Sequence, residues 1–176
     1  RSKNREENRM NSFVLYATKK GSSEIYAKEF ARKKNYRLLK REQSSTEDIA
    51  GSDKIYYFGS VYAGKVLGLE ELKREFPNNN LTVFPVGLSS SNDQEKLAEI
   101  QDNIMSVFPQ AEIIHLRGRL IKEQLSLPEK LIIKMISKAS KKKAAEDKLD
   151  IEKAIEQAVD NGSVDCIDLA VLEDIH

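Results

Sequence analysis

Short apolar runs alternate with amphipathic segments through the first two thirds of the chain, and this alternation most restricts its fold. Four runs are almost continuously apolar, are rich in β-branched and aromatic residues, and end in Gly, Ser or Thr. Such continuous apolarity is typical of strands that are covered on both faces. The four predicted strands are Ser12–Thr18, Lys54–Ser60, Leu81–Gly87 and Ala111–Gly118.

The segments between these strands have helical spacing. Apolar residues share one helix face in Tyr26–Ala31, in Leu67–Phe76 and in Leu97–Phe108, whereas the more polar run Tyr36–Glu42 fits an edge strand. Alternation of strand and helix predicts a parallel sheet with helices on both faces. Pro85 removes a backbone donor inside a predicted internal strand, so we expect a bulge or an early strand end there.

The alternation stops after Gly118. Residues 125–160 predict two helices, which a lysine-rich segment joins and which Asn161-Gly162 ends. We expect one more helix after that turn, with an apolar side formed by Ile167, Val171, Leu172 and Ile175.

Composition restricts the class of protein further. A chain of 176 residues suits one domain, which we expect to span residues 11–176 after a disordered arm or expression remnant at residues 1–10. The net charge of +1 gives no reason to expect a nucleic-acid partner. One cysteine and two histidines make a metal site implausible. Without an apolar run of about 18 residues we expect no membrane span, and we expect a cytoplasmic location.

Ligands of an open parallel sheet bind at the carboxyl ends of the strands, so the loops there are the candidate site. The first loop, Thr18–Ser23, combines hydroxyls, a glycine and a helix start, which is what a phosphate group requires. The same residues also fit an ordinary helix N-terminus, and both interpretations remain open. The phosphate-binding pattern GxxxxGK[ST] and the dinucleotide pattern GxGxxG are both absent.

The next two loops are also small and polar. Gly59–Lys65 places one aromatic, Tyr62, among small residues, which suits either a flat ring or a plain connection. Gly87–Asp93 is polar, and we expect Asn92 or Asp93 to cap the helix that follows.

These three loops in this order resemble flavodoxin. TKKGSS, GSVYAG and VGLSSS carry the resemblance, which extends over about Ser12–Ile175 through HLRGRL, LSLPEKLIIKMI and VDCIDLAVLEDI. The chain is similar to the flavodoxin-domain family that includes the menaquinone-dependent protoporphyrinogen oxidase. The resemblance implies an α/β flavodoxin-like three-layer sandwich, with a five-stranded parallel sheet in the order 2-1-3-4-5 and extra C-terminal helices.

The resemblance also implies an FMN site, with a phosphate loop, a loop along one side of the isoalloxazine and a loop at its other edge. The implied residues are Thr18, Lys19, Lys20, Gly21, Ser22 and Ser23 for the phosphate, Ser60, Val61, Tyr62, Ala63 and Gly64 for the ring, and Gly87, Leu88 and Ser89 for its edge. Electron-carrier flavodoxins usually have threonine where Lys20 stands, often use tryptophan at the flavin, and are acidic. This chain has no tryptophan and is nearly neutral, which favours an FMN-dependent oxidoreductase over a dedicated carrier.

Other polar residues have simpler explanations. We interpret His115 as a core or rim histidine, and Arg117 and Arg119 as surface residues rather than ligands of a substrate carboxylate. Lys141–Lys143 fit a solvated linker better than a peripheral membrane contact, because the sequence suggests no extended basic amphipathic stripe. Cys166 lies near two aspartates, which disfavours an activated thiol.

Three functions therefore remain open. The first is an FMN-binding flavodoxin-like oxidoreductase, related in activity to the protoporphyrinogen oxidase, with a small-molecule or quinone redox partner and no protein nucleophile. The second is a non-catalytic flavodoxin that carries electrons to a partner protein. The third is an α/β interaction module that binds no flavin.

Overall fold

A central parallel sheet organises the molecule. The computed structural model describes residues 11–44, 49 and 51–175, so the predicted arm at residues 1–10 lies outside the described residues. The sheet has the order β2-β1-β3-β5-β6, with parallel pairing throughout this path. These strands are β1 (Ser12–Ala17), β2 (Arg37–Lys40), β3 (Lys54–Tyr62), β5 (Leu81–Gly87) and β6 (Glu112–Ile113).

Counted along the chain, these five strands have the predicted order 2-1-3-4-5, and the flavodoxin-like α/β fold is confirmed. Two short strands extend the sheet: β4 (Lys65–Val66) pairs antiparallel with β3, and β7 (Leu116–Arg117) pairs parallel with β5. β1 is buried along its whole length, as its continuous apolarity predicts.

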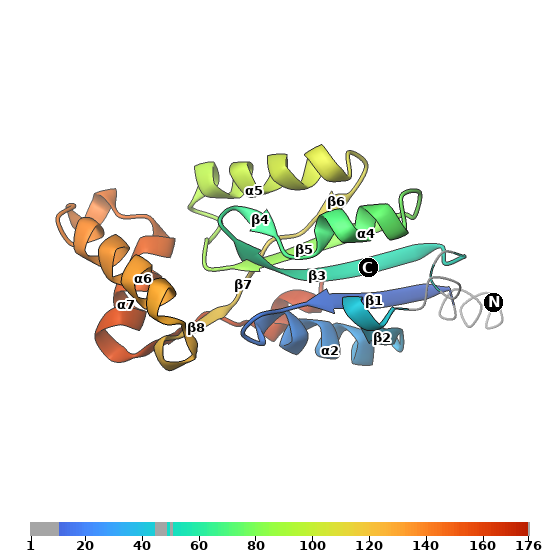
Figure 1. Ribbon diagram of the computed structural model, residues 1–176, viewed down its shortest axis with the longest axis horizontal. Helices are drawn as coiled ribbons and strands as arrows, with labels where there is room; N and C mark the ends of the chain where they lie inside the picture. Colours follow the sequence, from blue (N-terminus) through green and yellow to red (C-terminus); the bar gives the residue numbers. More distant parts are fainter. Residues whose placement is uncertain (1–10, 45–48, 50, 176) are drawn as a thin grey trace.

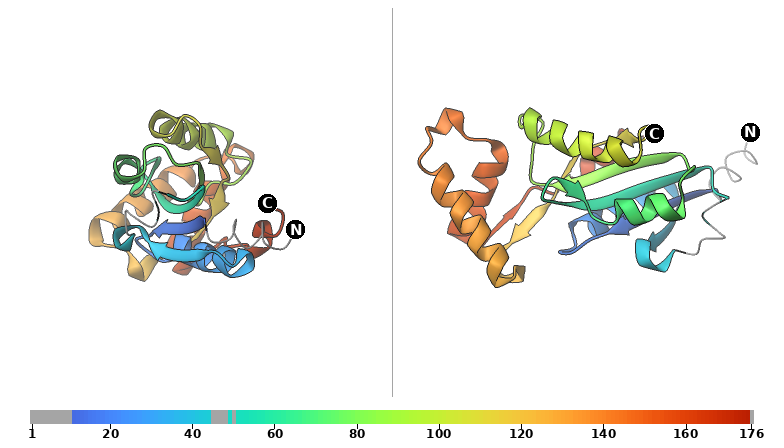
Figure 2. Two further views of the ribbon diagram at one scale, coloured as in Figure 1. Left: turned by 90° about the vertical axis from the view of Figure 1, so that its right-hand side faces the viewer. Right: turned by 45° about the horizontal axis from the view of Figure 1, so that its top comes forward.

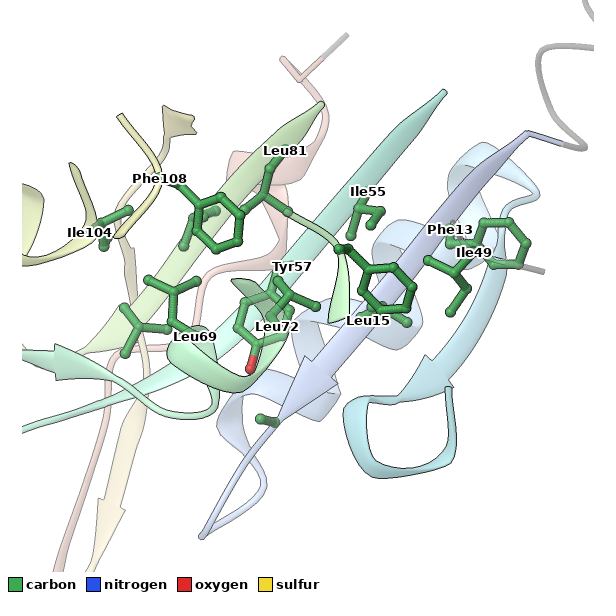
Figure 3. Close-up of a cluster of buried hydrophobic side chains, with 14 of the residues drawn as sticks. Phe13, Leu15, Ile49, Ile55, Tyr57, Leu69, Leu72, Leu81, Ile104 and Phe108 are labelled. Atoms are coloured by element: carbon green, nitrogen blue, oxygen red, sulfur yellow. The ribbon is translucent and has the colours of Figure 1, made fainter. Parts of the chain in front are cut away.

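Helices cover both faces of the sheet (Figures 1 and 2). α2 (Ser22–Lys34) lies on one face, and α4 (Leu69–Glu75) and α5 (Gln94–Val107) lie on the other. Each face has its own apolar core. The α4/α5 face packs mainly aliphatic residues together with Tyr57 and phenylalanines such as Phe13 and Phe108 (Figure 3), and the α2 face packs an aromatic cluster around Phe30.

The strand that contains Pro85 differs from the prediction. β5 continues through Pro85 to Gly87 without a bulge. The interruption falls instead in the neighbouring strand, which is split into β6 and β7 where one strand over Ala111–Gly118 was predicted. The carbonyls of Val83 and Gly87 both accept hydrogen bonds from that neighbour, so alternation directs the missing donor of Pro85 toward the gap.

The C-terminal part forms a separate cap at the carboxyl ends of the strands, toward which the arrow of β1 points in Figure 1. It contains β8 (Arg119–Ile121), α6 (Leu127–Ser140), α7 (Asp150–Asn161) and β9 (Ser163–Asp165). The two predicted helices are confirmed. β8 and β9 pair antiparallel, which the sequence analysis did not predict.

The prediction of a continuous helix after Gly162 is wrong. In the described residues that follow Gly162, β9 is succeeded by a 3₁₀ turn, Leu169–Leu172. The side chains of Asp165 and Asp168 accept hydrogen bonds from the backbone N–H groups of Ile167 and Ala170, which holds the backbone in turns instead of a continuous helix. Gly162 caps α7 at φ 89°, as predicted. Within the described part of the chain, no helix is both long and apolar enough to cross a bilayer.

Candidate functional site

A cavity of about 640 Å³ lies between the carboxyl ends of the strands and the C-terminal cap. All three loops singled out in the sequence reach it. Eleven of the fourteen predicted residues line it. The other three, Thr18, Gly21 and Ser23, are sequence neighbours of lining residues in the first loop, and Ser23 also hydrogen-bonds to the lining residue Ser60. The lining residues are Lys19, Lys20, Ser22, Ser60, Val61, Tyr62, Ala63, Gly64, Gly87, Leu88 and Ser89.

The first loop ends at a helix N-terminus without a side-chain cap. Gly21 occupies the cap position of α2 in the left-handed conformation at φ 95°, and its own N–H donates to Thr18 Oγ1 at 2.8 Å. The first intrahelical bond runs from Ile25 N to Gly21 O, so the N–H groups of Ser22, Ser23 and Glu24 have no acceptor within the helix. Backbone donors and the positive helix end together favour an anion at this point.

Hydroxyl groups join the first loop to its neighbours. Ser23 Oγ lies 3.0 Å from Ser60 Oγ in the second loop, and Ser22 Oγ accepts a hydrogen bond from Arg119 N at 3.1 Å. Gly118 allows this last contact, because a Cβ there would lie 2.9 Å from Ser22 Oγ. The segment after β7 is therefore a fourth component of the site, which the sequence analysis did not identify.

Lys20 does not point to the helix N-terminus. Its Nζ donates to the Gln124 carbonyl at 2.7 Å and lies 3.6 Å from Glu129 Oε1. Hydrogen bonds from Ser126, with a smaller contribution from Lys20, hold the pKa of Glu129 below its usual range, so this carboxylate is charged at neutral pH. Lys20 thus connects the first loop to the start of α6.

The second loop makes a tight turn with exposed backbone. Ala63 and Gly64 both have positive φ, and Asn103 Nδ2 holds the Gly64 carbonyl at 2.8 Å. Tyr62 is 50% exposed, and Lys19 Nζ lies 4.0 Å from the centre of its ring. One face of this ring is therefore occupied by a cation, which a flat ligand would have to displace or avoid.

The third loop is anchored to the cap. Asp93 is buried, and its carboxylate accepts from Asp150 N at 2.7 Å, from Ile151 N at 2.9 Å and from Ser90 N at 3.0 Å. Asp93 occupies the N-cap position of α5, as expected, but its side chain forms no cap bond to that helix and accepts from the first N–H groups of α7 instead. Asp150 returns the contact by accepting from Ser90 Oγ and Asn92 Nδ2, which lowers its pKa.

Arg117 has a positioning role in this loop. Its Nε and Nη2 donate to the Leu88 carbonyl at 3.1 and 2.8 Å. His115, which precedes it, has a pKa lowered by burial and lines no part of the cavity. His115 agrees with the core or rim position predicted for it. Arg117 and Arg119, which were expected at the surface, are half-buried, and Arg119 lines the cavity.

The cap supplies an apolar wall that the sequence analysis missed. Helical spacing predicted an apolar stripe on each of the two helices but not what the stripes face. The wall consists of Leu120, Leu125, Ile132, Ile133, Ile136, Ile151 and Ile155. The cavity therefore has a polar end at the first loop and an apolar end under α6 and α7. Among the described residues, no cluster of three or more His, Cys, Asp or Glu side chains suits a metal ion.

A family model and several solved structures resemble the chain. The family described as Flavodoxin domain matches residues 13–147. The solved structures that resemble the chain include the two-electron reduced flavodoxin of Megasphaera elsdenii (15% identity, 59% of this chain and 82% of that chain, TM-score 0.42). They also include a short-chain flavodoxin associated with a non-canonical PDU bacterial microcompartment (14% identity, 86% of this chain and 97% of that chain, TM-score 0.40). A third is the Trp repressor binding protein of Bacillus subtilis (14% identity, 61% of this chain and 84% of that chain, TM-score 0.43). No curated protein matches the chain.

Proposed function

The chain belongs to the flavodoxin domain family, and on this premise we propose that it binds FMN in the cavity and uses it for redox chemistry. One observation carries the proposal: three small polar loops at the carboxyl ends of parallel strands line a single cavity. The first of them opens at a helix N-terminus without a side-chain cap.

The residues of the first loop fit a phosphate. A side chain at Gly21 would be strained at φ 95°, so the turn that leads into the uncapped N-terminus of α2 favours glycine. In the proposal the phosphate accepts from the N–H groups of Ser22 and Ser23, while Thr18, through Gly21 N, shapes the turn. Lys19 and Lys20 border the site without reaching this point.

The second and third loops would hold the ring system. Ser60, Val61, Tyr62, Ala63 and Gly64 present backbone groups and one aromatic side chain, and Gly87, Leu88 and Ser89 border the opposite side. Bound FMN would supply hydride and electron transfer, and the protein would position it and exclude water from it.

The apolar wall favours a small apolar redox partner over a protein. A carrier has to present its flavin edge to a partner protein, whereas α6 and α7 here place isoleucines across the cavity. We therefore infer an FMN-dependent oxidoreductase that acts on a flat, apolar small molecule such as a quinone. The activity of a protoporphyrinogen oxidase is the more specific candidate that the sequence resemblance implies.

Flavin titration tests the binding step. Adding protein to FMN should quench the flavin fluorescence to saturation, and FMN should raise the melting temperature of the protein. The Ser22→Asp variant is expected to weaken binding, because it places a negative charge at the helix N-terminus where the phosphate binds. The absence of quenching and of a thermal shift in the wild-type protein would support a flavin-free interaction module instead.

A turnover assay separates the enzyme from the carrier. With FMN bound and a chemical reductant, the oxidoreductase should reduce short-chain quinones catalytically. Replacing Ile136 in the apolar wall with Asp should lower that rate while FMN quenching persists. Reduction of a protein such as cytochrome c at a high rate, with no quinone turnover, would favour the carrier.

A further inference from the structure

Arg119 places a cation at the polar end of the cavity, and its side chain has no hydrogen-bond or ion-pair partner among the described residues. It lines the cavity, and its Nε is buried without a hydrogen bond. Its guanidinium forms no ion pair with any residue in the part of the chain that the structure describes. A buried charged donor without a partner is costly, so such a group inside a cavity is a candidate for a contact with a ligand.

The guanidinium lies beside the first loop. A Cβ built on Gly21 would be 3.5 Å from Arg119 Nη2. The backbone of Arg119 is fixed at the same place, because its N–H donates to Ser22 Oγ and the adjacent Gly118 permits the close approach. The side chain therefore starts from an anchored point directly next to the uncapped end of α2.

The neighbouring charged groups are already engaged. Lys20 is held by Gln124 O and Glu129, and Lys19 lies over Tyr62. Asp165 is the strand partner of Arg119, but its carboxylate accepts from Ile167 N. Among the described residues, Arg119 is consequently a cation that borders the first loop, lines the cavity and is free to meet an anion at the helix N-terminus.

We propose that Arg119 binds the FMN phosphate and provides the charge-assisted contact that distinguishes FMN from riboflavin. The inference rests on the proposed function. The planar guanidinium donates two parallel hydrogen bonds to phosphate oxygens, which a lysine ammonium does not reproduce.

Titration of FMN and riboflavin against wild-type protein, Arg119→Gln, Arg119→Lys and Arg74→Gln tests this inference. Arg119→Gln should weaken FMN binding by about 10- to 100-fold and leave riboflavin binding within about twofold. Arg119→Lys should give an intermediate loss of FMN affinity. Arg74→Gln, the matched control at an exposed arginine of α4 outside the cavity lining, should keep wild-type affinity. Melting curves without flavin establish that each variant is folded, which is expected because the Ser22 contact uses the backbone of Arg119.

Two results would overturn the role of Arg119 alone. One is wild-type FMN affinity in Arg119→Gln, and the other is an equal loss of FMN and riboflavin, which indicates a structural effect. A wild-type protein that binds neither flavin would overturn the proposed function and this inference together. The wild-type titration therefore distinguishes the two failures.

The outer face of α6 carries a second, independent inference. Leu127, Leu131 and Met135 follow one another at four-residue spacing and are 81%, 60% and 63% exposed. Ile132 is also exposed and belongs to the cavity lining, so the apolar face continues to the mouth of the cavity. The helix is capped by a Ser126/Glu129 capping box and is therefore well defined without a partner on this face.

Lysines lie along one side of this face. Lys130, Lys134 and Lys138 have the same four-residue spacing, and none of them forms an ion pair with a described residue. Lys142 follows after the helix, while Lys141 and Lys143 pair with Asp160 and Glu152 of α7. An apolar face next to a basic edge matches the two attractions of an anionic lipid surface.

We infer that α6 docks the molecule on an anionic lipid surface, with its apolar face in the headgroup region. A second copy is the poorer occupant, because two-fold pairing of this face brings the unpaired lysines of both copies together. The docked orientation would turn the apolar end of the cavity toward the lipid.

Vesicle sedimentation tests the docking. Binding should be strong to phosphatidylcholine vesicles that contain phosphatidylglycerol and weak to phosphatidylcholine alone. Leu131→Gln combined with Met135→Gln should lower binding by roughly tenfold or more, whereas Met105→Gln, an exposed methionine on α5, should not change it. Each of Lys130→Gln and Lys134→Gln should cost roughly fivefold. Equal binding to both vesicle types, no binding to either, or dimers in solution that Leu131→Gln dissociates would overturn the inference.

Discussion

At the scale of single residues, two glycines with similar backbone conformations allow the effect of backbone strain to be distinguished from an effect on ligand binding. Gly21 and Gly162 have φ values of 95° and 89°, and each lies at a helix end. A side chain at Gly162 would meet no atom within 4 Å, whereas one at Gly21 would meet Arg119. Only the first position borders the proposed phosphate cradle.

We predict that Gly21→Asp lowers FMN affinity by more than about tenfold, because the carboxylate would pair with Arg119 and repel the phosphate. Gly162→Asp is the matched control: it should lose a similar stability, about 1–2 kcal/mol for a non-glycine residue in the left-handed region, and keep its FMN affinity. Fluorescence titration and urea unfolding measure the two effects. Equal FMN affinities of the two variants would contradict a phosphate site at Gly21.

His115 provides a prediction on pH. Burial lowers its pKa below the usual 6.5, so at acidic pH the unfolded chain binds more protons than the folded protein. The titration of His115 therefore does not affect the free energy of unfolding above about pH 6.5. As the pH falls below that value, protonation of the unfolded chain increasingly lowers the free energy of unfolding. We expect His115→Gln to lose less stability than wild type between about pH 7.5 and pH 5.5 in urea unfolding. Parallel pH profiles would show that His115 does not contribute.

At the scale of elements, the third loop and the helical cap are linked through Asp93. One buried carboxylate satisfies the first N–H groups of α7, although 57 residues separate it from Asp150. Lys20 makes the corresponding connection from the first loop to α6. The loops and the apolar wall are thus held in one arrangement by polar contacts at two points.

Asp93→Asn should destabilise the protein by about 2 kcal/mol, because the amide turns a donor toward the N–H groups that the carboxylate now accepts from. Hydrogen exchange of the Asp150 and Ile151 amides should accelerate. Asp102→Asn, an exposed site on α5, should change neither quantity. Unaltered exchange at α7 in Asp93→Asn would disprove the linkage.

At the scale of the whole molecule, the end of the chain returns to the central sheet. After α7, the 3₁₀ turn places Leu172 in the aromatic core under α2, and Tyr26 Oη accepts from Asp168 N while donating to the Arg117 carbonyl. The cap is therefore attached at both of its ends. We propose on this basis that residues 11–176 form a single cooperative domain.

Leu172→Ala should cost about 2–4 kcal/mol of unfolding free energy, because Leu172 is 1% exposed and its removal leaves a cavity in the core. Val171→Ala, one residue away and 40% exposed, should cost less than about 0.5 kcal/mol. Tyrosine circular dichroism and far-ultraviolet signals should give one transition in urea. Two separated transitions would show that the cap unfolds independently.

Local patterns in the sequence were enough to predict a parallel sheet and the three loops at the ends of its strands. Strands such as Ser12–Ala17 are apolar throughout because they are covered on both faces, and that signal is local. The order of the strands followed from the family resemblance and agrees with the structure. Most of the residues expected at the site line the cavity for the same reason, since carboxyl ends of parallel strands share one edge.

Tertiary structure alone decided what the local patterns face. The split between β6 and β7 depends on Pro85 of the neighbouring strand, and the cap on α7 depends on Asp93. Neither feature can therefore be predicted from the residues of β6, β7 or α7 alone. An apolar stripe shows that a helix buries one side but not against what, which is why the wall over the cavity was missed. Arg119 looked like a surface residue because its burial and its nearness to Gly21 arise only when distant loops meet. Contacts between residues far apart in sequence are set by packing, so the periodicity of a single segment does not predict them.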